Sequence, residues 1–505
     1  VVHFYPGAWC TSSQEPTNGV PIPDIARQML MRTEDSIRRF GDPFCTTDPD
    51  SYFNWLNSGA SFGSDPSRRI TRLWSEVYRL RPDVQRVFPD LDGAHRDSFL
   101  QWARQGGKYE HGIADALIVQ RGEGMAPMHP SARASGKNAT ERPFGVNVSG
   151  HANSEKGVGE VARSIVRALA TTGIPYVVND YRDPGSVNLD ATLTDFAHEN
   201  PYAANIIAMN ADQLSYFAVQ QGRQYFEDHY NIGHWAWELS AFPSEWFPSF
   251  EYLDEVWVAS SFINDALKRV SPLPVVTVPY AITGEYPQPI THRLHFGLPQ
   301  DTFVFLFIFD FASYIARKNP LGLIEAFKRA FRLKDNVLLL IKCSHSEYVP
   351  DDLRAIQQAA KGINVRITDS VLSREQVRTL IHLADCYISL HRAEGFGLTI
   401  AEAMSLEKPV IATGYSGNMD YMTEANSFPC EYRTVPIDRG HGPYAPGFVW
   451  AEPDLDHAAA LMRHVYEHFG EAKGIGARAR RDILNHCHPQ VVGKGIRERL
   501  LQAVQ

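Results

Sequence analysis

The sequence predicts an α/β protein with two doubly wound parallel-sheet domains in tandem, preceded by a helical N-terminal region. From residue 143 onward, apolar strand patterns alternate with helical patterns, and repeated strand–helix–strand units form parallel sheets with right-handed crossovers. The run Phe303–Phe309 is apolar throughout, which is typical of a strand buried on both faces. Residues 1–142 differ, since they are rich in Arg, Asp, Trp and Pro and poor in β-branched runs.

The size and composition of the chain limit its class. Its 505 residues are enough for about three domains. With 44% apolar and 21% charged residues, it has the composition of an ordinary globular protein. The net charge of −9 weighs against nucleic acid as a partner, because proteins that bind nucleic acid carry basic patches. No apolar run approaches the roughly 18 residues that a transmembrane helix needs. We therefore expect a cytoplasmic protein, with peripheral association at the inner face of a membrane left open.

Four segments are expected along the chain: residues 1–142, a helical region and linker; residues 143–283, the first α/β domain; residues 284–485, the second; and residues 486–505, a C-terminal helix. The helices expected in the N-terminal region are Ile25–Phe40, Arg68–Leu80 and Ala94–Gly106. The strands expected in the first domain are Gly145–Ser149, Tyr176–Asp180, Asn205–Asn210, Tyr230–Trp235, Glu255–Ala259 and Val275–Pro279. Those expected in the second are Phe303–Phe309, Val337–Lys342, Asn364–Thr368, Cys386–Leu390 and Pro409–Ala412.

The most informative segment is Ser389–Met404, which follows a buried strand and opens a helix. Glu394 falls in the loop at the carboxyl end of the strand, and Glu402 falls about one turn into the helix. The intervening glycines allow close approach of a ligand and leave helix-end amides free for an anion, while a carboxylate accepts hydrogen bonds from sugar hydroxyls. The alternative is a solvated glutamate followed by an ordinary helix start, which the Gly-Phe-Gly-Leu spacer disfavours.

This segment resembles the Glu–seven residues–Glu signature of family 4 glycosyltransferases. The resemblance covers residues 144–505, and the loop Gly414–Asp420 resembles one in the bacterial polysaccharide branch of that family. It implies the GT-B fold, in which two Rossmann-like domains face a cleft, the first binding the acceptor and the second the nucleotide sugar, with His488–Leu501 crossing back to the first. It also implies that Glu402 binds the ribose. The residues it assigns to the donor sugar and phosphate are Glu394, Gly395, Phe396, Gly397, Leu398 and Thr399.

Two adjacent cations, Arg317 and Lys318, stand soon after a strand of the second domain and suit a diphosphate. Arginine clasps two oxygens at once, while lysine acts as a point charge. Preorganised cations stabilise the negative charge that grows on the leaving phosphate, at about 3 kcal/mol for each interaction. The alternative is a solvated pair of basic residues. The resemblance disfavours it, because the family has a basic pair in the matching place. We therefore expect a metal-independent reaction without a cofactor. The run His486–His488 is interpreted as a surface run rather than a metal site.

Two constellations are expected on the first domain. Gly157 and Gly159 precede Glu160 and form an incomplete dinucleotide fingerprint. By resemblance this loop lies near the donor phosphates, and a plain strand-to-helix turn is the alternative. His234 begins a His-Trp-Ala-Trp-Glu-Leu run that ends with Glu238 and Leu239. His234 is a candidate to contact the donor sugar, and Glu238 is a similar candidate, but a buried packing histidine is the competing interpretation.

The nucleobase is expected near Leu372, in the loop Asp369–Leu372 at the end of a strand in the second domain. Nothing in this loop separates uracil from guanine. The pattern predicts a glycosyltransferase that moves a hexose from a nucleotide diphosphate sugar to a glycan or lipid-linked acceptor. The resemblance further implies retention of configuration and a role in bacterial surface polysaccharide synthesis. A nucleotide-sugar epimerase and a non-catalytic scaffold are the alternatives. For residues 1–142, acceptor handling and docking to other subunits in an oligomer both stay open.

Overall fold

The protein is represented by a computed structural model that describes residues 59–60, 70–80, 82–91, 95–103, 142–183, 186, 188–286 and 292–504. The chain divides into two compact units, Val1–His129 and Pro130–Gln505. The predicted helix Ile25–Phe40 lies outside the described residues.

The described residues of the first unit form a short antiparallel strand pair and three helices. Strand β1 (Gly59–Ala60) pairs with β2 (Ile70–Thr71). The helices are α4 (Arg72–Leu80), α5 (Pro82–Val87) and α6 (Arg96–Trp102). The predicted helix Arg68–Leu80 therefore begins later, at Arg72, because its β-branched residues Ile70 and Thr71 belong to a strand. Aromatic rings of α4 and α6 pack on one another, with 6.4 Å between the centroids of Trp74 and Phe99.

The first α/β domain of the second unit holds a six-stranded sheet that is parallel throughout, in the order β4-β3-β5-β6-β7-β8. Its strands coincide with the six expected ones to within two residues at each end. They are β3 (Val146–Gly150), β4 (Tyr176–Asp180), β5 (Ala204–Ala208), β6 (Tyr230–Trp235), β7 (Glu255–Val258) and β8 (Val275–Thr277). The helices are α8 (Gly157–Leu169), α9 (Ala211–Gln221), η5 (Arg223–Tyr225), η6 (Ser244–Tyr252) and α10 (Ser261–Lys268).

The second α/β domain holds another parallel six-stranded sheet, in the order β11-β10-β9-β12-β13-β14. Its strands are β9 (Phe303–Ile308), β10 (Val337–Cys343), β11 (Val365–Asp369), β12 (Cys386–Ser389), β13 (Val410–Thr413) and β14 (Phe428–Cys430). Its α-helices are the short α11 (Ile315–Lys318) and the longer α12 (Pro320–Ala330), α13 (Pro350–Ala359), α14 (Arg374–Leu383), α15 (Leu398–Ser405) and α16 (Leu455–Glu467). Short 3₁₀ turns are η7 (Arg293–Phe296), η8 (Phe311–Ser313), η9 (Ser346–Tyr348) and η10 (Gly417–Asp420).

Two features of this domain were not expected. Strand β14 has only three residues with a proline at its centre, so it gives little strand signal. An antiparallel hairpin, β15 (Tyr432–Pro436) and β16 (Val449–Pro453), follows it, and most side chains of β15 are exposed. Two helices of this domain have capped N-termini: the Asn319 side chain accepts from the Gly322 amide, and Ser373 and Gln376 form a capping box.

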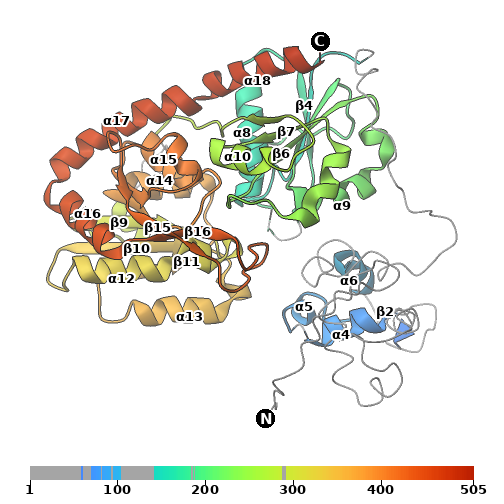
Figure 1. Ribbon diagram of the computed structural model, residues 1–505. Helices are drawn as coiled ribbons and strands as arrows, with labels where there is room; N and C mark the ends of the chain where they lie inside the picture. The colour runs from blue at the N-terminus through green and yellow to red at the C-terminus, as the bar shows by residue number, and fades with distance from the viewer. Residues whose placement is uncertain are drawn as a thin grey trace. The chain divides into compact units, whose positions relative to one another are not determined.

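The C-terminal helices α17 (Phe469–Cys487) and α18 (Pro489–Val504) run from the second domain to the first (Figure 1). Helix α18 packs directly on α8, since the backbone at Gly493 approaches the Ala168 carbonyl so closely that an added Cβ would lie 2.5 Å from it. Arg499 of α18 also binds the buried Glu255 of β7, with Nε 2.9 and 3.0 Å from the two carboxylate oxygens. None of the described helices is both long and apolar enough to span a bilayer.

Candidate functional site

The residues with the strongest sequence signal meet at the carboxyl ends of strands β9 and β12. Strand β9 leads to the short helix α11, which carries Arg317 and Lys318, and β12 leads to the loop that carries Glu394. Lys318 Nζ forms a short hydrogen-bonded ion pair with Glu394, and Arg317 Nη1 lies 3.3 Å from the same carboxylate oxygen. The second sheet therefore brings together Arg317, Lys318 and Glu394, although Arg317 and Glu394 lie 77 positions apart in the sequence.

The charge of Glu394 is fixed by these cations. Burial by itself would raise the pKa of the Glu394 carboxyl, but Lys318 and Arg317 outweigh it and lower the pKa to about 2. Glu394 is consequently ionised at neutral pH and can accept hydrogen bonds from hydroxyl groups, but it has no proton to donate.

Arg317 is the centre of contacts between the two α/β domains. Its side chain is 4% exposed, and Nη1 donates to the Ala393 carbonyl at 2.9 Å. From the first domain, Glu238 approaches Nη2 at 3.7 Å. Glu238 also accepts a 2.9 Å hydrogen bond from the Tyr444 hydroxyl, and the ring of Tyr444 lies 5.9 Å from the guanidinium. Among the described residues, the buried Nε of Arg317 has no hydrogen-bond partner, so one strong donor is available to a ligand.

The Gly414–Asp420 loop supports the Glu394 loop from behind. His391 is fully buried, with Nε2 3.1 Å from Asn418 Oδ1, and the Asn418 amide donates to the Thr413 carbonyl at 3.0 Å. Burial lowers the pKa of His391 to about 4, so this ring is neutral and structural. The Glu394 amide donates to Ser416 Oγ at 2.8 Å. The loop thus fixes the backbone on which Glu394 stands.

Of the residues after Glu394, the first two contact the first domain and the next three form the start of helix α15. Gly395 lies against the first domain: its carbonyl accepts from Ser260 Oγ at 2.6 Å, and an added Cβ would collide with the Trp237 carbonyl. The Phe396 ring packs against Tyr280 of the first domain at 4.9 Å. Gly397 has φ of +82° and is the N-cap of α15, where the amides that follow have no partner within the helix. Leu398 and Thr399 form its half-buried first turn.

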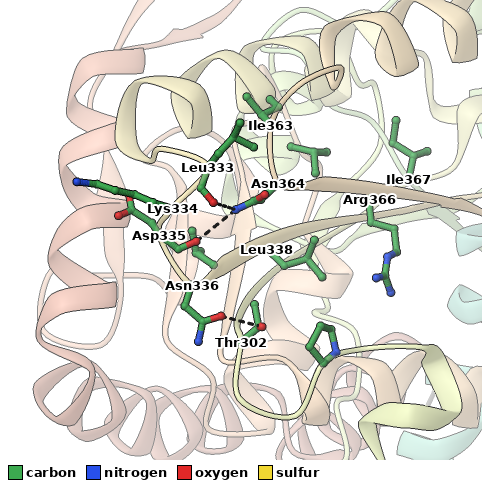
Figure 2. Close-up of a pocket in the computed structure, with 13 residues that line it drawn as sticks. Thr302, Leu333, Lys334, Asp335, Asn336, Leu338, Ile363, Asn364, Arg366 and Ile367 are labelled. Atoms are coloured by element: carbon green, nitrogen blue, oxygen red, sulfur yellow. Dashed lines mark hydrogen bonds between the residues drawn. The ribbon is translucent and has the colours of Figure 1, made fainter.

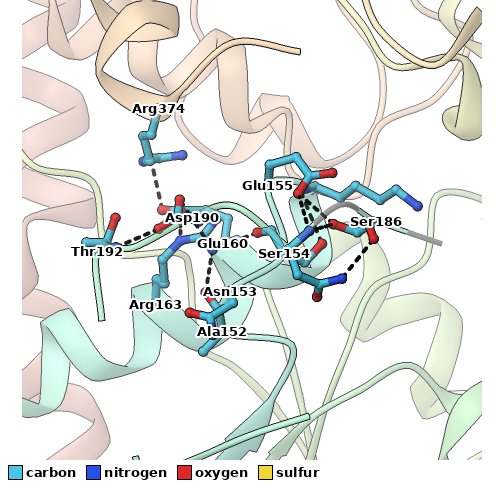
Figure 3. Close-up of polar contacts among 12 residues, drawn as sticks. Ala152, Asn153, Ser154, Glu155, Glu160, Arg163, Ser186, Asp190, Thr192 and Arg374 are labelled. Carbon is cyan, nitrogen blue, oxygen red and sulfur yellow. Dashed lines mark hydrogen bonds and ion pairs between the residues drawn. The ribbon is translucent and has the colours of Figure 1, made fainter. Parts of the chain in front are cut away.

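Glu402 lies in a second cluster of charges that joins the two domains. Figure 3 shows Arg374, Glu160 and Arg163 of this cluster. It pairs closely with Arg374, the first residue of α14, and Arg374 Nη2 also lies 2.9 Å from Glu160 of α8. Glu160 is 1% exposed and is further bound by Arg167 and by Arg163, the latter at 3.1 Å. The sequence did not predict that Arg374 and Glu160 belong to the site. For Glu160, the sequence signal was a carboxylate that follows two glycines at the start of a helix.

The two glycines before Glu160 serve different purposes. Gly159 lies in the first turn of α8, where an added Cβ would collide with the Ser154 carbonyl and lie 2.8 Å from the His151 carbonyl. An added Cβ at Gly157 meets no atom within 4 Å. Gly159 is therefore required by backbone packing, whereas the space beside Gly157 is open.

The replacement Gly159→Ala is expected to destabilise the protein by about 1–3 kcal/mol, because the colliding atoms are backbone carbonyls that cannot rotate away. Gly157→Ala is the matched control and should change stability by less than about 0.5 kcal/mol. Urea denaturation followed by tryptophan fluorescence measures both. Equal midpoints for the two variants would show that the loop relaxes around the new methyl group and that Gly159 is not required.

A third contact between the domains was not expected from the sequence. His345 follows β10 with φ of 63°, and its Nδ1 lies 2.8 Å from Asp310, which follows β9. On its other side, Nε2 lies 3.7 Å from Glu155, which stands in the loop before α8. The hydrogen bond to Asp310 raises the pKa of His345, so the contact strengthens as the ring becomes protonated.

His234 lies away from the ion pairs. Its ring is fully buried and stacks on Tyr280 at 5.7 Å, and Nε2 lies 3.3 Å from the Val278 carbonyl. Burial lowers its pKa to about 4, so the ring is neutral. Tyr280 separates it from Phe396, and among the described residues no hydrogen bond, ion pair or ring contact joins it to Arg317, Lys318 or Glu394. This position favours the competing interpretation, a packing histidine that supports the Tyr280–Phe396 contact.

Leu372 lies half-buried in its loop, next to a hydrogen bond between Ser346 and Asp369. At the opposite edge of the same sheet, at the amino ends of β10 and β11, a groove of about 670 Å³ is lined by 13 residues (Figure 2). In open α/β sheets ligands bind at the carboxyl ends of the strands, so this groove is not a part of the site.

Among the described residues, no group of three His, Cys, Asp or Glu side chains is placed to hold a metal ion.

Solved structures with the same architecture identify the fold as GT-B. A glycosyltransferase from Rickettsia africae ESF-5 has 14% identity over 72% of this chain and 99% of that chain, with a TM-score of 0.52. Alr3699/HepE of Anabaena, in complex with UDP and glucose, has 15% identity over 71% and 100%, with a TM-score of 0.51. Sucrose-phosphate synthase from Thermosynechococcus elongatus has 16% identity over 72% and 100%, with a TM-score of 0.52. The predicted fold class is confirmed.

The sequence adds a more specific finding. Residues 292–433 match the family model described as "Glycosyl transferases group 1". The matched segment lies within the second α/β domain and contains Arg317, Lys318, Glu394 and Glu402. Comparison with curated protein sequences gave no match.

Proposed function

We propose that this protein is a glycosyltransferase that moves a hexose from a nucleotide diphosphate sugar to a glycan or lipid-linked acceptor, with retention of configuration and without a metal ion. The observation that carries the proposal is the joint position of Arg317, Lys318 and Glu394 in the segment that matches the glycosyltransferase group 1 family model, directly opposite Glu238 of the first domain. The second domain would bind the donor, and the first would bind most of the acceptor. A role in bacterial surface polysaccharide synthesis fits the resemblance of the Gly414–Asp420 loop.

The ion pairs suggest how the donor would bind. Without ligand, Glu394 neutralises Lys318 and Arg317. A diphosphate would compete for these cations, with the unpartnered Arg317 Nε as a further donor. The Glu394 carboxylate, ionised because its pKa is about 2, would then accept hydrogen bonds from the hexose hydroxyls. The ion pair between Glu402 and Arg374 would weaken, and Glu402 would accept hydrogen bonds from the ribose hydroxyls.

In the proposed reaction, the bond between C1 of the hexose and the phosphate oxygen breaks and its electron pair leaves on the diphosphate. The acceptor hydroxyl oxygen forms the new bond to C1 on the same face, and its proton passes to a phosphate oxygen. Arg317 and Lys318 stabilise the departing charge. This route needs no protein general acid, in keeping with an ionised Glu394 and a neutral His234.

A ligand screen tests the proposal. Nucleotide sugars with UDP and GDP, each with and without EDTA, are added in a thermal-shift assay, with UDP-glucose first because UDP and glucose occupy the Anabaena protein of the same fold. A donor present at 100 times its Kd should raise stability by about 2.7 kcal/mol. Release of nucleotide that depends on an added acceptor supports transfer. Release or sugar isomerisation without acceptor would favour the epimerase alternative, and no binding of any nucleotide would reject both.

A further inference from the structure

An exposed aromatic ring lies beside the proposed reaction centre and has no part in it so far. Tyr314 is 38% exposed and has φ of 63°, a conformation that is costly for a bulky side chain. It immediately precedes α11, and its carbonyl accepts the amides of Arg317 at 3.1 Å and Lys318 at 3.2 Å. The backbone of Tyr314 is therefore fixed relative to the helix that carries the two cations.

The loop of the β15–β16 hairpin forms one wall beside this ring. Tyr444 packs edge to face on Tyr314, with 5.5 Å between centroids, and the backbone at Gly442 lies so close to the Tyr314 ring that an added Cβ would collide with it. Tyr444 and Gly442 lie outside the matched segment 292–433, which ends at the first strand of the hairpin. The wall thus lies outside the segment that matches the family model.

The first domain supplies carboxylates on the other side. Glu238 accepts from Tyr444 and approaches Arg317, and since a carboxylate offers about four acceptor positions, it has room for a further donor. A second carboxylate of the first domain, Asp212 of α9, is buried, and burial first and Glu238 in addition raise its pKa to about 6. The Glu238 carboxylate beside Tyr444 disfavours an anionic ligand and suits a neutral hydroxyl group.

We propose that Tyr314, Tyr444 and Glu238 form the subsite for the acceptor, and that the group bound there is an uncharged sugar ring rather than a phosphate. The C–H face of the ring packs on Tyr314, and a hydroxyl donates to Glu238. This inference rests on the proposed function, because it places the acceptor hydroxyl next to the Arg317–Lys318 pair. The inference predicts that the acceptor is the terminal sugar of a glycan and not a phosphorylated small molecule.

The test measures binding rather than turnover. Methyl α- and β-glycosides of glucose, galactose and mannose are titrated by saturation-transfer NMR, with and without UDP, and glycerol 3-phosphate serves as the anionic comparison. Wild type should bind at least one glycoside and should not bind glycerol 3-phosphate at this subsite. Tyr314→Ala should raise the glycoside Kd roughly tenfold, as expected for loss of an aromatic contact. The Kd of UDP should change less than about twofold.

Three further variants separate the contact from the fold. Tyr314→Phe keeps the ring and should bind glycosides like wild type. Glu238→Gln keeps the shape and should weaken glycoside binding while reducing the rejection of glycerol 3-phosphate. Tyr432→Ala removes a similarly exposed ring on the same hairpin and should have no effect. The proposal is overturned if wild type binds no glycoside, or if Tyr314→Ala and Tyr432→Ala bind alike. Absence of both UDP and GDP binding in wild type would instead reject the proposed function, and the two failures are distinguishable because the glycosides are also titrated alone.

Discussion

Lys318→Met is expected to lower kcat for glycosyl transfer by roughly 10²–10³-fold, in the range found when one preorganised donor to a developing anion is removed. The substitution keeps the aliphatic stem but removes Nζ, which is the closest cation to Glu394. Arg317 then has to neutralise Glu394 from 3.3 Å and hold the leaving diphosphate alone. Because one guanidinium must then pair with both groups, the negative charge on the leaving diphosphate is poorly stabilised. The substitution should therefore lower kcat more than it changes KM.

The measurement is initial rate against donor concentration, with the donor that the ligand screen selects. Lys328→Met is the matched control, because Lys328 lies on the neighbouring helix α12 with an exposed side chain and a 3.9 Å surface ion pair. It should retain wild-type kcat and KM. Circular dichroism and the thermal midpoint verify the fold of both variants. A folded Lys318→Met protein with wild-type kcat would contradict the assignment of the leaving-group cation.

Glu160→Ala is expected to destabilise the protein by about 3–5 kcal/mol, as found when one partner of a buried ion pair is removed. Glu160 is fully buried and holds three arginines, of which Arg163 and Arg374 approach at 3.1 and 2.9 Å. Its loss leaves these cations without their shared partner. Because Arg374 comes from the second domain, the contact between the domains should weaken as well. Urea denaturation measures the effect, and Glu251→Ala, an exposed position of the first domain, should change nothing.

The pH dependence of stability gives an independent measure of the same cluster. Burial alone would raise the pKa of Glu160, but Arg374, Arg167 and Arg163 lower it from 4.5 to about 2. Since the pKa is lower in the folded state, Glu160 stabilises the fold above pH 4.5, by about 3 kcal/mol, and this contribution is lost as the pH falls from 4.5 toward 2. Glu160→Ala should therefore lose less stability than wild type over this window. Parallel curves would show that Glu160 does not titrate as the cluster requires.

The sequence predicted the strands of both sheets because parallel sheets buried on both faces give long apolar runs, as in Phe303–Phe309. It did not predict β14 or the β15–β16 hairpin, since short or exposed strands carry no such run. Within the site, the spacing of Glu394 and Glu402 predicted that one would lie in a loop and the other in a helix. It did not predict that each would pair with a different arginine, Arg317 for the first and Arg374 for the second.

By itself, the sequence determined the fold class and the chemistry at the carboxyl edge of the second sheet, because hydrophobic periodicity and the residues that follow a strand are local properties of the chain. Only the tertiary structure decided which residues of the first domain face this chemistry. Glu238 and Glu160 meet Arg317 and Arg374 across the two domains, and Tyr444 reaches Glu238 from a hairpin 206 residues further along. Such contacts depend on how two separately encoded sheets dock, and docking is set by the packing of whole surfaces rather than by any local pattern.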